Sequence, residues 1–443
     1  MITTKKIGLV SLGCPKNLVD SEEMLGALVE GGQAELVDAN NPSDVVVVNT
    51  CAFIESAKQE SIEAILTQLK RRKKGEVGRV VVAGCLAQRY GAELAAELPE
   101  VDAFIGIQSA GQIGDVVFGK RGTALPMAGN LVAPITEKYP LIPPSRVRAT
   151  APWTAYLKVS EGCDHGCTFC SIPNFRGKHR SKPMERIVEE ARRLVDAGAC
   201  ELNLIAQDTT AYGMDLYKEL ALPRLLEQLG QIDDLKWVRL LYCYPTMMTD
   251  RLMKTMADTP NVAHYVDIPL QHGSDSMLRR MKRGGSVASY HRLLARLRTA
   301  MPDIAVRTTF LVGFPGETDA EFAELESFVS EAQFDRVGVF TYSPEEGTPG
   351  YDMTPVVSKK LARERRAALM ETQQPISLAR NRELVGRSIA VLMEGEGRGR
   401  TWRDAPEIDG IAQVRGADTA TPGSWAQARV VEALPYDIVA EAM

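Results

Sequence analysis

The stretch TAYLKVSEGCDHGCTFCSIP, residues 154–173, places a strand-like run directly before three closely spaced cysteines. The run Ala155–Val159 is mostly apolar, which is typical of a buried strand. Cys163, Cys167 and Cys170 then follow with the spacing C-x3-C-x2-C. Three thiolates can hold three irons of a [4Fe–4S] cube, which leaves the fourth iron open to a ligand from outside the chain. The stretch therefore indicates a cluster-binding loop at the carboxyl end of a strand.

The alternative for these cysteines is a structural zinc site, which takes four protein ligands. His165 lies inside the loop, where it would have to bind the same ion as the cysteines on both sides of it. His179 follows nine residues after the last cysteine, and the sequence holds no second C-x2-C pair. The spacing therefore favours an iron–sulfur cluster over zinc.

Strand-like and helical runs alternate six times from this point onward. The predicted strands are Ala155–Val159, Leu202–Ala206, Trp237–Tyr242, Ala263–Ile268, Ala305–Val312 and Arg336–Thr341. The predicted helices include Arg186–Ala197, Tyr217–Gln231, Tyr290–Ala300, Ala320–Ala332 and Ser358–Gln373. Such alternation predicts parallel strands with right-handed crossovers. Because six units fall short of the eight in a closed barrel, we expect a partial, open (β/α)6 barrel with its active-site groups in the loops after the strands.

Three further strand-like runs near the start of the chain each end in a cysteine: KIGLVSLGC at Cys14, SDVVVVNTC at Cys51 and GRVVVAGC at Cys85. Helical patterns follow them at Leu18–Val29, Ile54–Leu69 and Ala87–Leu98. The apolar runs lack alternation, which indicates strands buried on both faces of a parallel sheet. Parallel strands present their carboxyl ends along one edge, so the three cysteines are expected to share a metal site there. The alternative is that each is a small buried hydrophobe.

Composition divides the chain into four segments and predicts the α/β class overall. Residues 1–126 form the N-terminal parallel-sheet domain, and residues 127–150, which are rich in proline, form a linker. Residues 151–376 form the open barrel. Residues 377–443 hold short strands separated by Gly and Pro turns, which predict a small antiparallel β-barrel.

The overall composition is that of a globular protein, with 45% hydrophobic and 25% charged residues. No run approaches the roughly 18 apolar residues of a membrane span, and no signal peptide is apparent, so we expect a cytoplasmic protein with no membrane partner. The net charge is −5. Residues 384–443 carry six arginines, no lysine and nine acidic residues. An acidic module suits a basic protein partner better than a phosphate backbone, so direct RNA recognition is not expected.

The C-x3-C-x2-C loop, with an aromatic residue before its last cysteine and a strand before it, resembles that of the radical S-adenosylmethionine (SAM) superfamily. The segments LVGFPGET (Leu311–Thr318) and VFTYS (Val339–Ser343), which end the fifth and sixth strands, resemble its SAM-binding turns. The resemblance implies that the open iron binds SAM and that reduction yields a 5′-deoxyadenosyl radical. The implied cofactor-binding residues are Phe169, Gln207, Gly313, Phe314, Val339 and Thr341.

The chain as a whole resembles the methylthiotransferase family within that superfamily. The resemblance implies two [4Fe–4S] clusters, an auxiliary one on Cys14, Cys51 and Cys85 and a radical one on the later triad. It also implies two uses of SAM and a C-terminal TRAM domain that grips the substrate. Cys200 and Cys243 match no ligand position and are expected to be structural thiols.

Two branches of this family differ in substrate: adenosine in transfer RNA, or an aspartate of ribosomal protein S-twelve. The segments SLGCPKNLVDSE, with Pro15 and Lys16 after the first cysteine, and RDAPEIDG (Arg403–Gly410) resemble the ribosomal-protein branch. The implied reaction is methylthiolation of the aspartate β-carbon. Arg176 and Arg180, on the loop after the second triad, are candidates to bind the substrate or cofactor carboxylate, the alternative being solvated loop charges.

Other functions stay open on the sequence alone. The same chemistry on transfer RNA is the nearest alternative. A non-catalytic electron carrier with two clusters and a zinc-stabilised binding module are alternatives of other classes. For the enzyme, we expect an electron donor such as flavodoxin or ferredoxin as a further partner.

Overall fold

The three predicted cysteine-bearing strands lie next to one another in an N-terminal parallel sheet. The computed structural model describes residues 4–30, 32–118, 129–140 and 146–443. The strands of this sheet are β1 (Lys5–Ser11), β2 (Ala34–Val37), β3 (Ser43–Thr50), β4 (Val77–Gly84), β5 (Ala103–Ile105) and β6 (Gly129–Leu131). Their order is β2-β1-β3-β4-β5-β6. The sequence patterns missed β2, β5 and β6 because runs of three or four residues carry little periodicity, and β6 lies within the predicted linker.

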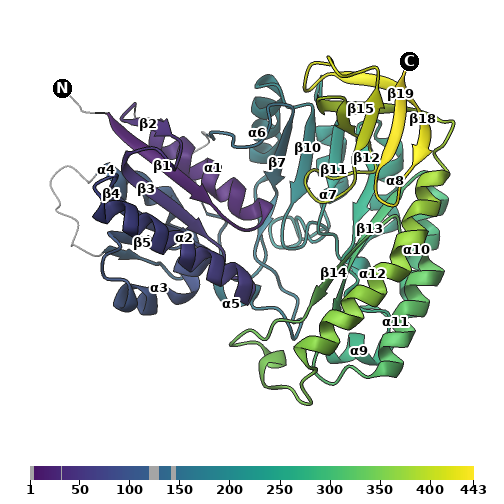
Figure 1. Cartoon of the computed structure of the whole chain (residues 1–443), viewed down its shortest axis with the longest axis horizontal. Coiled ribbons are helices and arrows are strands. Elements are labelled where there is room, and N and C mark those ends of the chain that lie inside the picture. Colours follow the sequence, from purple (N-terminus) through teal and green to yellow (C-terminus); the bar gives the residue numbers. More distant parts are fainter. Residues whose placement is uncertain (1–3, 31, 119–128, 141–145) are drawn as a thin grey trace.

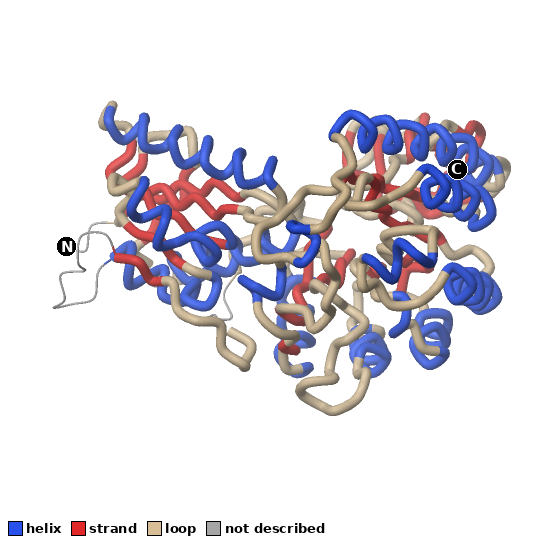
Figure 2. Tube along the Cα trace, turned by 90° about the horizontal axis from the view of Figure 1, so that it is seen from below, coloured by secondary structure: helices blue, strands red, loops and turns tan. Residues whose placement is uncertain are grey.

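Helices cover both faces of this sheet, as Figures 1 and 2 show. They are α1 (Pro15–Val29), α2 (Glu55–Lys73), α3 (Cys85–Glu97), the 3-10 helix η1 (Ile107–Gln112) and α4 (Ile113–Phe118). Val46 and Val48 pack with residues of α2 and α3, whereas Val45 and Val47 pack with residues of α1 and α4. This two-sided burial explains the continuous apolar runs in the sequence.

The central part of the chain forms the predicted open six-stranded barrel, with all strands parallel in the order β14-β13-β12-β11-β10-β7. These strands are β7 (Thr154–Lys158), β10 (Glu201–Ile205), β11 (Trp237–Leu240), β12 (Val262–Asp267), β13 (Ala305–Val312) and β14 (Arg336–Thr341). Short elements near the cysteine loop are β8 (Ser160–Glu161), α5 (Ile172–Arg176) and β9 (Arg180–Ser181). The remaining helices are α6 (Met184–Asp196), α7 (Leu222–Leu229), η2 (Pro245–Met247), α8 (Asp250–Asp258), α9 (Asp275–Arg280), α10 (Val287–Ala300), α11 (Asp319–Ala332), η3 (Pro349–Asp352) and α12 (Lys359–Arg382).

Helix α12 runs further than its sequence pattern predicts and crosses the boundary expected at residue 376. Pro375 lies inside it. The side chain of Gln373 donates to the carbonyl of Phe334 at 2.8 Å, and the hydroxyl of Ser377 donates to the carbonyl of Asp335 at 3.0 Å. These contacts bind the helix to the segment before β14 on both sides of the proline, so the helix continues despite the missing backbone donor.

The C-terminal residues form a closed five-stranded barrel. Its strands are β15 (Ser388–Gly395), β16 (Arg398–Arg400), β17 (Ala412–Arg415), β18 (Trp425–Ala433) and β19 (Ile438–Ala442). Four of its strand pairs are antiparallel and one, β17–β19, is parallel. In Figure 1 this barrel, in yellow, packs at one end of the central strands.

Contacts with the first residues of β10 and β11 show at which end of the central strands the C-terminal barrel packs. Glu201, the first residue of β10, accepts hydrogen bonds from Arg400 at 2.7 and 3.0 Å. Trp237, the first residue of β11, packs edge-on against Trp425 with ring centroids 4.6 Å apart. The C-terminal barrel therefore covers the amino ends of the central strands, opposite the loops that follow their carboxyl ends.

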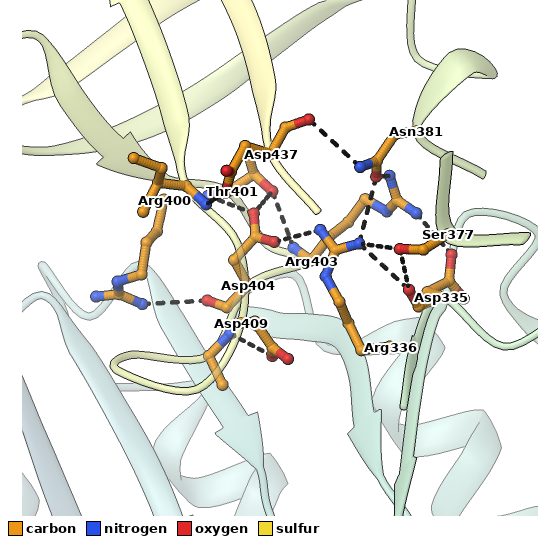
Figure 3. A network of polar contacts seen from close by, with 12 residues as sticks. Asp335, Arg336, Ser377, Asn381, Arg400, Thr401, Arg403, Asp404, Asp409 and Asp437 are labelled. Atoms are coloured by element: carbon orange, nitrogen blue, oxygen red, sulfur yellow. Dashed lines mark hydrogen bonds and ion pairs between the residues drawn. The ribbon is translucent and has the colours of Figure 1, made fainter. Parts of the chain in front are cut away.

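Buried ion pairs hold this interface together (Figure 3). Arg336 lies 2.8 Å from Asp404, and Arg403 lies 2.6 Å from Asp335. Asn381 of α12 accepts hydrogen bonds from both arginines and donates to the carbonyl of Leu434. The segment RDAPEIDG (Arg403–Gly410) thus lies in the interface between the central barrel and the C-terminal barrel. Among the described helices, none is long and apolar enough to cross a membrane.

Candidate functional site

The N-terminal cysteines follow three neighbouring strands at the same edge of the sheet. Cys14 precedes α1 after β1, Cys51 comes directly after β3, and Cys85 begins α3 after β4. Gly13 has a φ of 90°, and a Cβ placed there would lie 2.8 Å from the Cβ of Cys51. The first loop therefore passes directly over the second cysteine, which only glycine permits. The structure brings the three thiols to one edge, as predicted from the strand pattern.

Burial makes these thiols hard to ionise. It raises the pKa of Cys51 and raises the pKa of Cys85 to about 12, although the nearby Arg176 acts in the opposite direction. A thiolate is the form that binds metal, and a metal ion compensates its charge. All eight cysteines of the chain are free. Three thiols, two of them buried, with a cation beside them fit the predicted iron–sulfur cluster at this edge.

The second triad lies in the loop between β8 and α5. Burial raises the pKa of Cys163 to about 12 and that of Cys170 to about 11. The residue between Cys167 and Phe169 fixes the loop, since Thr168 donates from its backbone N–H to Met281 at 3.0 Å and from its hydroxyl to Arg280 at 3.0 Å. The loop is thus bound to the segment that follows α9.

The two histidines that could complete a zinc site have other partners. His165 Nε2 lies 2.6 Å from Asp208, and its ring stacks on Tyr244 with centroids 3.5 Å apart. His179 Nε2 lies 3.2 Å from Ser181 Oγ. Within the described parts of the chain, no three His, Cys, Asp or Glu side chains are close enough together to hold a single metal ion. In a [4Fe–4S] cube each cysteine binds a different iron, so the ligands are further apart.

A cation that the sequence patterns missed lies beside the second triad. Arg283 Nη1 is 3.8 Å from the Sγ of Cys167, and its guanidinium lies 4.0 Å from the centre of the Tyr244 ring. It also donates to the carbonyl of Pro269. The flanking motif, KRGG, is an ordinary loop sequence and gave no signal for this role. Each triad therefore has an arginine within reach of one sulfur.

The residues expected to bind SAM lie on neighbouring strand ends. Phe314 packs with Met277 and Met281 in a small apolar cluster, and Phe169 packs against the same cluster. Gly313 has a φ of 78°, and a Cβ there would lie 2.5 Å from that of Ala362. These positions bring the cysteine loop and the turn after β13 together.

Gly313 and Val339, which are predicted to bind SAM, also make hydrogen bonds within the chain itself. The N–H of Gly313 donates to Glu317 at 2.5 Å, so it is already bonded. Val339 packs its side chain into the barrel core and accepts a hydrogen bond from Arg366 at 3.0 Å through its carbonyl. Thr341 ends β14 and pairs with Val312 in the sheet. Their binding roles remain predictions.

Gln207 gives a direct indication of a missing ligand. It follows β10, and both its amide nitrogen and its amide oxygen are buried without a hydrogen-bond partner. An unsatisfied buried amide is unfavourable by about 1–3 kcal/mol, so such a group is expected to bind something the chain itself does not supply. The site thus fits a polar cofactor or substrate at the carboxyl end of the central strands.

Arg176 and Arg180, which are predicted to bind the substrate, both make contacts within the chain itself. Arg176 is buried and donates to Glu161 at 2.9 Å and to Asp20 at 2.8 Å, which neutralise it. Arg180 is also buried and donates to the carbonyls of Thr136 and Arg176 at 3.0 and 2.7 Å. Arg176 is neutralised by carboxylates, whereas Arg180 donates to carbonyl and amide oxygens and its Nε has no hydrogen-bond partner, so neither is a solvated loop charge. Both arginines join parts of the chain, and their substrate-binding roles stay predictions.

Lys16 is a buried cation at the junction of the two triads. Its Nζ lies 3.3 Å from the carbonyl of Ala206 and 3.3 Å from the centre of the Tyr242 ring. Burial lowers its pKa, whereas the nearby Cys14 raises it, and Lys16 in turn lowers the pKa of Cys170. It is therefore within electrostatic reach of both triads. In the sequence, Lys16 stood out only as part of the motif that resembles the ribosomal-protein branch of the family.

Comparison with known proteins gives the chain its family. Three family models match it: the uncharacterized protein family UPF0004 over residues 6–106, the radical SAM superfamily over residues 157–329 and the TRAM domain over residues 385–443. The ribosomal protein uS12 methylthiotransferase RimO of Caldanaerobacter subterraneus subsp. tengcongensis is 47% identical over 442 residues, which cover 99% of this chain and 100% of that protein. The chain belongs to the RimO family.

A second RimO, from Symbiobacterium thermophilum, is 46% identical over 449 residues, which cover 99% of this chain and 91% of that protein. Membership of the RimO family confirms the resemblance drawn from the cysteine motifs. The chain is a radical SAM methylthiotransferase, and the electron-carrier and zinc-module alternatives are no longer favoured.

The fold is also found in more distant enzymes. The radical SAM methyltransferase TsrM of Kitasatospora setae, solved with cobalamin and a [4Fe–4S] cluster, matches 79% of this chain and 77% of its own with a TM-score of 0.57 and 14% identity. At this identity the likeness shows a shared fold alone. As a radical SAM enzyme, the RimO family member described here works with a [4Fe–4S] cluster and SAM.

Proposed function

We propose that this enzyme methylthiolates the β-carbon of an aspartate in ribosomal protein uS12, with two [4Fe–4S] clusters and two molecules of SAM. Its curated relatives act on uS12, as their names state. The observation that carries the proposal of two clusters is the contact between Arg176 Nη2 and the Sγ of Cys85 at 3.2 Å. Arg176 lies six residues after Cys170, so this contact holds the second triad beside the first.

Each triad would hold one cluster. Cys163, Cys167 and Cys170 would hold the cluster that binds SAM, while the N-terminal triad would hold the one that carries the sulfur. When bound, these groups supply the radical that removes hydrogen from the aspartate β-carbon and the methylthio group that replaces it. The chain itself contributes the sulfur ligands, the nearby cations and a buried junction that excludes water.

The acidic C-terminal barrel supports a basic protein substrate over transfer RNA. We further propose that the electron donor is a flavodoxin or a ferredoxin and that the enzyme works in the cytoplasm, where thiols stay reduced.

The test is anaerobic reconstitution followed by incubation with uS12, SAM and a strong reductant. We expect about eight irons per chain, four for each cube. Replacing Cys163, Cys167 and Cys170 by alanine should remove about four and leave the other four in place. The product should gain the mass of a methylthio group in place of one hydrogen, on aspartate. Modification of transfer RNA adenosine with uS12 unchanged would reject the proposed substrate.

A further inference from the structure

The ammonium of Lys16 has no carboxylate partner, unlike the neighbouring buried cations Lys158 and Arg176. Lys158 pairs with Asp20, Glu23 and Glu161, and Arg176 pairs with two of these same residues. No carboxylate of the described residues lies within 4.0 Å of Lys16 Nζ, although the side chain is only 7% exposed. Buried charges are normally paired, so this position is incomplete in the protein alone.

The surroundings of Lys16 hold a second unsatisfied group. The carbonyl that accepts from its Nζ belongs to Ala206, and the next residue is Gln207, whose amide has no partner at either atom. A cation without a carboxylate partner and an amide without a hydrogen-bond partner thus both belong to the carboxyl end of β10. The ammonium without a carboxylate and the amide without a hydrogen-bond partner together indicate a ligand that accepts hydrogen bonds and carries negative charge.

The position relative to the cysteines identifies which ligand this is. Lys16 lies two residues after Cys14, and its Nζ contacts the carbonyl of Ala206, at the carboxyl end of β10 in the barrel that carries the second triad. A group bound to Lys16 would therefore lie between the two triads, where the reacting carbon of the substrate has to be. The charge of Arg176 is already balanced by two carboxylates, and Arg180 is bound to the backbone carbonyls of Thr136 and Arg176.

We propose that Lys16 binds the side-chain carboxylate of the substrate aspartate and thereby places its β-carbon between the two clusters. This rests on the proposed function. The ammonium would donate a charge-assisted hydrogen bond to the carboxylate, and the unpaired amide of Gln207 would donate a second. The carboxylate of SAM offers the same chemistry, so the experiment has to separate the two sources.

The experiment measures binding of a uS12 peptide to the reconstituted enzyme in the presence of SAM and without reductant, so that no turnover occurs. The peptide carries either the target aspartate or asparagine in its place. Lys16→Met should weaken binding of the aspartate peptide about tenfold or more and leave that of the asparagine peptide unchanged. Lys16→Arg, which keeps the charge, should recover part of the affinity. Lys178→Met, an exposed lysine on the cysteine loop, is the matched control and should bind as the unchanged enzyme does.

Several results would overturn the proposal. One is equal binding of the aspartate peptide by Lys16→Met and the unchanged enzyme, and another is an equal loss for both peptides. Loss of SAM affinity with peptide affinity retained would assign Lys16 to the cofactor carboxylate instead. Loss of iron in both Lys16→Met and Lys16→Arg would assign it to cluster assembly. If the unchanged enzyme leaves the aspartate peptide unmodified after reductant is added, the proposed function fails and this proposal fails with it.

Discussion

The guanidinium of Arg176 lies 3.2 Å from the Sγ of Cys85, although Arg176 belongs to the central barrel domain and Cys85 to the N-terminal sheet domain. These two domains are called the central lobe and the N-terminal lobe below. Arg176 ends α5 beside the central barrel, whereas Cys85 begins a helix of the N-terminal sheet. The same guanidinium pairs with Asp20 of α1 and with Glu161 of β8. One cation thus joins the lobes and at the same time stabilises negative charge on a predicted cluster ligand.

Replacing this cation should affect both stability and iron content. Arg176→Met leaves two buried carboxylates without their arginine, which is expected to lower the free energy of unfolding by about 3–5 kcal/mol. The Cys85 thiolate also loses its neighbouring charge. We expect the variant to retain about four irons after reconstitution in place of about eight, measured by iron analysis and thermal unfolding.

Arg180→Met is the matched control, because Arg180 is buried on the same loop but donates mainly to backbone carbonyls. It should lose stability and still bind the full number of irons. A full iron content in Arg176→Met would contradict the role assigned to the contact with Cys85.

The attachment of the C-terminal barrel should depend on Glu201. This buried carboxylate accepts from Arg239 at 3.1 Å and from Arg400 at 2.7 Å. Glu201→Gln leaves Arg239 without its carboxylate partner and Arg400 with Glu394 alone, and it is expected to destabilise the protein by about 3–5 kcal/mol. Urea unfolding followed by fluorescence of the Trp237–Trp425 pair reports on this interface. Glu394→Gln, at the more exposed partner of Arg400, should lower stability by less than about 1 kcal/mol.

The same carboxylate predicts a pH dependence. Burial tends to raise the pKa of Glu201, but Arg400 and Arg239 outweigh it and lower the pKa from 4.5 to about 2. A lowered carboxylate pKa means that the stabilisation is fully present above about pH 4.5 and is lost as the pH falls toward 2. The difference in unfolding free energy between the unchanged enzyme and Glu201→Gln should therefore shrink between pH 5 and pH 3. A constant difference over this interval would count against the ion pair.

The turn at Gly313 should tolerate no side chain. Gly313→Ala places a Cβ 2.5 Å from that of Ala362 at a φ of 78°, so we expect a loss of about 2 kcal/mol or more together with weaker SAM binding. Equilibrium dialysis with SAM and thermal unfolding measure the two effects. Gly114→Ala is the control, because a Cβ there has no neighbour within 4 Å and the residue lies in α4. It should leave stability unchanged or raise it by up to about 1 kcal/mol.

The order of elements could be predicted well from the sequence. Strands such as Val45–Val48 and Ala305–Val312 are long and apolar, and each is followed by a clear helical pattern. The helix predicted from Tyr217 begins only at Leu222, because Lys218 takes a positive φ and Pro223 sits in the first turn. Helix α8 was missed because it has only nine residues.

The candidate site could be predicted where chemistry is encoded in spacing. The two cysteine triads are of this kind, whereas Gln207 was proposed from its place after a predicted strand, and the cluster and cofactor roles of all these residues stay predictions. The pairing of Arg176 with Asp20 could not be foreseen, because it joins residues 156 positions apart that only tertiary packing brings together. The same holds for Lys16, which has no carboxylate of the described residues within 4.0 Å of its Nζ. The residues next to Arg176 and Lys16 in the sequence carry no information about the side chains that surround them in the fold.

Phe175, one residue before the cation that joins the lobes, is 2% exposed and packs in the core of the N-terminal lobe beside Phe104 and Ile107. During synthesis the N-terminal sheet leaves the ribosome first, yet Phe175 of its core lies 44 residues beyond Leu131, the end of its last strand. That lobe therefore cannot finish packing until the loop that carries the second set of thiols has been translated. The first three thiols therefore reach their final surroundings only after the residues that carry the second three have been made.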